Sequence, residues 1–131
     1  MVRLLTRVRL PAAALMAVVG MGLALPANAG DAGKGKSVFA AQCSMCHSAA
    51  RGGPTILGPN LYGVVGRKAG SLPGYPYSSG MKAAGFTWSA EQLRTYLPAP
   101  RNTVPGTKMS FAGLKNPTQL DDLIAYLETL K

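Results

Sequence analysis

The sequence is poor in the residues that build most metal and nucleophile sites. Its 131 residues include one histidine, two cysteines and five acidic residues, against 14 lysines and arginines. A structural zinc ion needs four ligands, and no second Cys/His pair is available to complete such a site. Strand-like alternation of useful length and internal repeats are also missing, so the sequence gives no support for a β-sheet or repeat fold.

The two cysteines and the histidine all lie in one run, Cys43-Ser44-Met45-Cys46-His47. This C-x-x-C-H pattern is typical of covalent attachment of a c-type haem. Two thiols three positions apart near a helix end can form thioethers to one porphyrin, and the next residue's imidazole can bind the iron. A thioredoxin-like dithiol would need a βαβ pattern, which is missing. A disulfide between Cys43 and Cys46 would close a very short, strained loop.

The N-terminus has the features of a targeting segment. Positive charges at Arg3, Arg7 and Arg9 precede an apolar stretch over 11–25, and Ala27-Asn28-Ala29 matches a small-x-small cleavage pattern. An uncleaved membrane anchor is the alternative, but about 20 apolar residues are normally needed to span a bilayer. We therefore expect a signal peptide over 1–29, removed after Ala29 by the general secretory route, since no paired arginines occur.

Residues 30–131 then form one small domain with 11 basic and five acidic residues. Export makes nucleic acid an unsuitable partner. An acidic protein patch or an anionic membrane surface suits the positive charge better.

Three helices are predicted in this domain. The first covers about 32–46, and the second follows Trp88 with a capping box over 89–92 and stops at Pro98. The third has Asn116 as its cap, Pro117 in its first turn and an apolar stripe over 120–127. The Gly/Pro-rich segments 51–80 and 98–115 are expected to be loops. Loops of that length would normally count against the assignment, but they can wrap and pack against a haem.

A second iron ligand must come from a methionine, because no second histidine exists. Met45 lies inside the attachment run, too close to cross to the other face, and Met81 is expected to fill the core. Met109 follows a Pro-Gly turn over 104–107 that can present one side chain inward. Met109 is therefore the preferred candidate.

In these features the chain resembles class I cytochrome c, of the mitochondrial and bacterial photosynthetic-carrier type, here as an exported bacterial precursor. The resemblance covers essentially all of 31–131. It depends on the run 43–47, on segments 58–63, 66–70, 105–109, 111–113 and 123–127, and on Trp88 and Tyr96. It implies an all-α fold with three main helices and long loops wrapped around one covalently attached haem. Cys43 and Cys46 would bind the haem, with His47 and Met109 as axial ligands.

The resemblance also implies roles for other residues. The Pro59 carbonyl would accept a hydrogen bond from the His47 ring. Tyr96 and Thr107 would hydrogen-bond around the Met109 sulfur, and Gly35 would allow the first helix to approach the last. The haem propionates would be faced or neutralised by Arg67, Tyr77 and Trp88. Met81 and Thr103 depart from the family's usual residues, and the ring of lysines around the haem edge is thinned.

The implied function is that of a periplasmic single-electron carrier rather than an enzyme. It would be a monomer with no stable membrane insertion after cleavage, and its redox partners would have acidic docking surfaces. The candidate docking residues are Lys36, Arg101, Lys108 and Lys115. Two alternatives are a haem enzyme or gas sensor, which needs an open sixth position, and a tethered subunit whose leader is its anchor.

Overall fold

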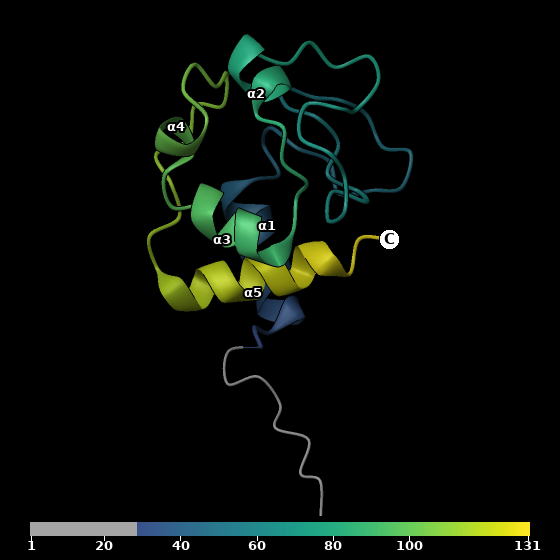
Figure 1. Ribbon diagram of the computed structural model, residues 1–131. Helices are drawn as coiled ribbons and strands as arrows, with labels where there is room; N and C mark the ends of the chain where they lie inside the picture. Colours follow the sequence, from purple (N-terminus) through teal and green to yellow (C-terminus); the bar gives the residue numbers. More distant parts are fainter. Residues whose placement is uncertain (1–28) are drawn as a thin grey trace, which may run out of the picture.

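The computed structural model describes residues 29–131 (Figure 1). The predicted signal peptide lies outside the described residues, apart from Ala29. The described chain contains the helices α1 (Ala32–Gln42), α2 (Ser79–Ala83), α3 (Ala90–Tyr96), α4 (Pro100–Thr103) and α5 (Pro117–Glu128). Over residues 29–131 the only β pairing is an isolated antiparallel bridge between Lys68 and Thr87. The all-α fold class is therefore confirmed.

Helices α1 and α5 cross each other and form the base of the domain (Figure 1). Gly35 is buried at the crossing, where a β-carbon would collide with the backbone carbonyl of Asp122. Next to it the rings of Phe39 and Tyr126 pack with centroids 5.6 Å apart. The N–H of Asp31 donates to the buried Asp122 carboxylate at 2.7 Å. The close approach expected at Gly35 is thus present.

The caps of α3 and α5 follow the sequence pattern. The side-chain oxygens of Ser89 and Asn116 each accept a hydrogen bond, at 3.0 Å, from the backbone N–H three residues further on. Pro117 occupies the first turn of α5. These contacts satisfy N–H groups that have no partner inside the helix.

Helix α1 ends at Gln42, earlier than the predicted end at Cys46. The N–H groups of Cys43 and Ser44 both donate to the carbonyl of Phe39, and the chain then turns. Two short helices were not predicted: α4 lies within the expected loop 98–115, and α2 begins at the end of the expected loop 51–80. Ser78 caps α2, and Pro100 opens α4. Both are single turns, too short to show an apolar period in the sequence.

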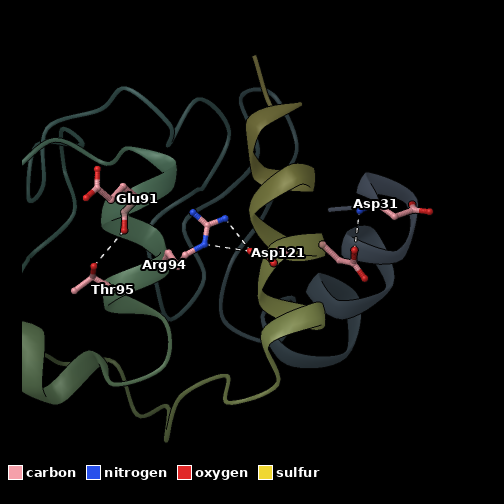
Figure 2. A network of polar contacts seen from close by, with 6 residues as sticks. Asp31, Glu91, Arg94, Thr95 and Asp121 are labelled. Atoms are coloured by element: carbon pink, nitrogen blue, oxygen red, sulfur yellow. Dashed lines mark hydrogen bonds and ion pairs between the residues drawn. The ribbon is translucent and has the colours of Figure 1, made fainter. Parts of the chain in front are cut away.

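Helix α3 is tied to α5 at the surface. Figure 2 shows the Arg94 guanidinium directed toward Asp121. The distance between Arg94 Nη2 and Asp121 Oδ1 is 2.8 Å. Beneath this pair the core is continuous between the helices. Its members on α1, α3 and α5 are Phe39, Leu93, Tyr96, Leu120, Leu123, Ile124 and Leu127.

Candidate functional site

The run 43–47 forms a tight turn directly after α1. The N–H groups of Cys46 and His47 both donate to the carbonyl of Cys43, at 3.0 and 2.9 Å. No disulfide joins the two cysteines, which are half-buried at the wall of a cavity. Burial, with a smaller contribution from the neighbouring Cys46, raises the pKa of Cys43 to about 11. A raised thiol pKa is the opposite of the lowered pKa that a dithiol redox site needs.

The imidazole of His47 has a fixed orientation. Its Nδ1 lies 2.7 Å from the carbonyl oxygen of Pro59, which can only accept, so Nδ1 carries the proton. Burial lowers the pKa of His47, and the Pro59 hydrogen bond opposes that effect. A neutral ring with a proton on Nδ1 leaves the Nε2 lone pair free to bind a metal.

The ring lies so close to the backbone that Gly58 is required beside it. A β-carbon on Gly58 would come within 2.7 Å of Nδ1 and 2.9 Å of Nε2 of His47. The buried Asn60 holds this loop by donating to the carbonyls of Ala50 and Gly53. No role was predicted for Asn60 from the sequence. Its position directly after the Gly-Pro pair was the only feature that could have indicated one.

Met109 lies in the segment between α4 and α5. Val104 accepts from the N–H of Thr107, and Gly106 in that turn has φ +77°, a conformation that favours glycine. The Tyr96 hydroxyl lies 3.9 Å from the Met109 sulfur, and the Thr107 hydroxyl accepts from the N–H of Met109 at 3.2 Å. Burial raises the pKa of Tyr96, so its hydroxyl remains a donor at neutral pH.

Both cysteines, His47 and Met109 line one cavity of about 460 Å³. That volume is within the roughly 300–1,000 Å³ of small-molecule and cofactor sites. The attachment pair Cys43 and Cys46, the ring of His47 and the Met109 thioether all reach it. So do all six predicted pocket residues, namely Pro59, Arg67, Tyr77, Trp88, Tyr96 and Thr107.

The cavity wall combines aromatic packing with two cationic residues, Arg67 and Lys108. Trp88 stacks edge-on against Tyr96, with ring centroids 4.8 Å apart. Arg67 uses two of its five N–H donors in hydrogen bonds to the carbonyls of Asn60 and Tyr62. The predicted core methionine, Met81, is buried and also lines this cavity.

The four candidate docking residues are exposed but do not all lie together. Lys108 lines the cavity and donates to the carbonyl of Pro76 at 2.6 Å. Arg101 and Lys115 line a second, shallower hollow of about 510 Å³, where the Lys115 ammonium also donates to the Pro98 carbonyl. Lys36 lies on α1 and lines neither hollow.

These residues fit a haem. An apolar cavity receives a neutral imidazole and a thioether from separate segments, and two thiols lie beside the imidazole. Histidine and methionine together are an established axial pair for haem iron in electron-transfer proteins. Within residues 29–131 no three His, Cys, Asp or Glu side chains converge as a metal site, so the zinc alternative gains no support.

Comparison with known proteins agrees with this geometry. Residues 32–131 match the family model described as Cytochrome c. The chain belongs to the cytochrome c family, and is therefore a haem-bearing electron carrier with one covalently attached haem c. Its relatives include both cytochromes c and cytochromes c2.

Three relatives illustrate the similarity. Cytochrome c2 of Rhodomicrobium vannielii is 48% identical over 120 residues, covering 87% of this chain and 93% of the relative. Cytochrome c of Euglena viridis is 47% identical over 102 residues, covering 78% of this chain and 99% of the relative. Cytochrome c of Trypanosoma brucei brucei is 55% identical over 84 residues, covering 64% of this chain and 90% of the relative.

Proposed function

We propose that the chain is a periplasmic single-electron carrier whose haem is bound by Cys43 and Cys46 and ligated by His47 and Met109. The observation that carries this assignment is the cavity itself, which both thiols, the imidazole and the thioether line together. The haem supplies the one-electron redox couple when bound. A thioether ligand and an apolar surrounding favour a raised reduction potential.

The protein's own residues would keep this site closed and rigid. Pro59 holds the His47 ring in one tautomer and orientation. Tyr96 and Thr107 restrain Met109 through its sulfur and its backbone N–H. Two strong ligands held in this way leave no position for a substrate, which supports a carrier rather than an enzyme.

We further propose that the carrier moves between a quinol–cytochrome c reductase or a dehydrogenase and a terminal oxidase or other acceptor. The positive charge of the chain suits partners with acidic docking surfaces. Arg101 and Lys115 share one hollow and Lys108 lies at the haem cavity, so these three are the better docking candidates, and Lys36 is the weaker one.

The assignment as a carrier that is free of the membrane depends on cleavage after Ala29. Among residues 29–131 no helix has the length and apolar character to cross a membrane. N-terminal sequencing of the exported protein should begin at Gly30. A protein that retains residues 1–29 in the membrane would contradict cleavage and support the tethered-subunit alternative. Sedimentation of the exported protein should give a monomer.

The ligand assignment is tested by carbon monoxide and cyanide binding. The native protein should bind neither rapidly at neutral pH, because both axial positions are filled. Met109→Ala should bind both and show a lower reduction potential. Met81→Ala is the matched control, since it removes the other methionine that lines the same cavity and should leave the site closed. Rapid, tight binding by the native protein, or no change in Met109→Ala, would overturn the proposal.

A further inference from the structure

The backbone of the segment that carries Met109 makes few hydrogen bonds of its own. Within the described chain, 29–131, the N–H groups of residues 110–113 have no hydrogen-bond acceptor. A hollow of about 510 Å³ lies between this segment and α4, since residues 99–102 and residues 110–112 both line it. The backbone of the segment is therefore held chiefly at its two ends.

The C-terminal end of the segment is tied to the end of α3. The carbonyl of Leu97 accepts a hydrogen bond from the N–H of Leu114 at 2.9 Å. The next carbonyl, that of Pro98, accepts one from the Lys115 ammonium. The C-terminal end of a helix has unpaired carbonyls and favours a nearby cation. Lys115 thus supplies a charge-assisted hydrogen bond at the point where α3 ends.

The chain lies directly against the Pro98 carbonyl at this point. A β-carbon on Gly113 would overlap that carbonyl and would lie 3.0 Å from Nζ of Lys115. Gly113 also has φ +113°, a conformation that favours glycine. Leu114 is buried in the core, whereas Lys115 is exposed. The hydrogen bond from Lys115 therefore closes a tight backbone junction on its exposed side.

The same end of α3 also contacts the sulfur of Met109. Tyr96 is the last residue of α3, and its hydroxyl lies 3.9 Å from that sulfur. Tyr96 and Pro98 are only two residues apart. A hydrogen bond to the Pro98 carbonyl therefore fixes the segment to the part of the fold that also positions the Met109 thioether.

We propose that Lys115 is a positioning residue for Met109 and acts through its hydrogen bond to the Pro98 carbonyl. This inference rests on the proposed ligation of the haem iron by Met109. The hydrogen bond keeps the segment 109–114 against α3, where the contact between Tyr96 and the sulfur can form. Without it the segment opens more often, because fewer contacts must break. This role needs no partner protein and is separate from docking.

Two other cations near the segment show which comparison is informative. Arg101 lines the same hollow as Lys115, but within residues 29–131 its guanidinium makes no hydrogen bond or ion pair. Lys108 donates to the Pro76 carbonyl, but it adjoins Met109, so a change there would alter the ligand's own surroundings. Arg101 is therefore the matched control, since its loss removes the same charge from the same hollow.

The experiment measures the rate at which cyanide binds to the ferric, haem-loaded protein at neutral pH. Cyanide can bind only after Met109 has left the iron, so at saturating cyanide the rate reports opening of the segment. Lys115→Gln should bind cyanide about fivefold faster than the native protein, the scale of one exposed charge-assisted hydrogen bond. Lys115→Arg should stay within about twofold of the native rate, because a single carbonyl acceptor is satisfied by either cation. Arg101→Gln should match the native rate.

Hydrogen exchange gives a second measurement that does not involve the iron. The Leu114 N–H, which donates to the Leu97 carbonyl beside the Lys115 contact, should exchange faster in Lys115→Gln than in the native protein. Exchange at this position should be native in Arg101→Gln.

Three outcomes would overturn the inference or its basis. A native value of either measurement in Lys115→Gln would remove Lys115 from the positioning of Met109, while ligation by Met109 would still hold. Equal increases in Lys115→Gln and Arg101→Gln would assign the effect to lost charge and not to the hydrogen bond. A native protein that binds cyanide as fast as Met109→Ala would contradict the proposed ligation itself.

Discussion

Replacing Gly35 by alanine should destabilise the protein through the crossing of α1 and α5. A β-carbon at this position would overlap the carbonyl of Asp122 and lie 2.8 Å from Cβ of Tyr126. Both obstacles belong to the α5 backbone or its first side-chain atom, so neither can move aside by changing rotamer. The helices would have to separate, and Phe39 would lose part of its contact with Tyr126.

The expected magnitude is the difference between two opposing effects. Overpacking a core costs about 1–3 kcal/mol and sometimes more, and a backbone obstacle places this site at the upper end of that range. Alanine in place of glycine stabilises a helix interior by about 1 kcal/mol. The net loss should be about 2 kcal/mol, which lowers Tm by about 8–16 °C in a domain of about 100 residues.

Thermal unfolding of the haem-loaded protein by circular dichroism measures this effect. Gly33→Ala is the matched control, because it makes the same substitution two residues earlier in α1. Its β-carbon would meet only the Asp31 carboxylate, at 3.1 Å, which is the end of a side chain. Gly33→Ala should therefore change Tm far less. Equal midpoints for the two variants would refute the steric argument at the crossing.

Three further predictions concern single residues. Asn60→Ala should lower the free energy of unfolding in urea by about 2–4 kcal/mol, because it removes the hydrogen bonds that Asn60 donates to the carbonyls of Ala50 and Gly53 and the one it accepts from the Tyr62 N–H; a loss below about 1 kcal/mol would contradict that role. The hydrogen bond from the Lys34 N–H lowers the pKa of Asp31, so the charged cap stabilises the fold above the carboxyl's ordinary pKa and this contribution is lost as the pH falls through the lowered value. As the pH is lowered, the free energy of unfolding should therefore fall more steeply in the native protein than in Asp31→Asn, and parallel curves would refute this. Arg94→Gln should cost less than about 1 kcal/mol, because the pair with Asp121 is partly exposed, and the loss should shrink in high salt.

The sequence predicted the parts of the fold that depend on neighbouring residues. The caps at Ser89 and Asn116 and the stripe of α5 are local patterns, and the structure has them where they were expected. The end of α1 was misplaced because Cys43 fits the apolar face of a helix but instead begins a turn. Helices α2 and α4 were missed because a single turn contains no period to detect.

The candidate site was predictable for a different reason. Its residues are chemically rare in this chain, since one histidine and two cysteines leave few possible arrangements. The resemblance to cytochrome c supplied the pocket residues, which periodicity could not have found. The burial of Asn60 and the exposure of Met45 and Ile56 could not be predicted, because burial and exposure in loops depend on contacts between distant segments.

The two proposed iron ligands, His47 and Met109, are held in place in different ways. His47 follows directly on the two cysteines, and its ring is fixed by the Pro59 carbonyl at 2.7 Å and by the backbone at Gly58. Met109 lies far along the chain and is positioned by side chains, chiefly through the long contact of its sulfur with Tyr96. Local openings occur where fewer contacts must break. The Met109 segment should therefore open first, so the strength of the Tyr96 and Thr107 contacts decides how firmly the site stays closed.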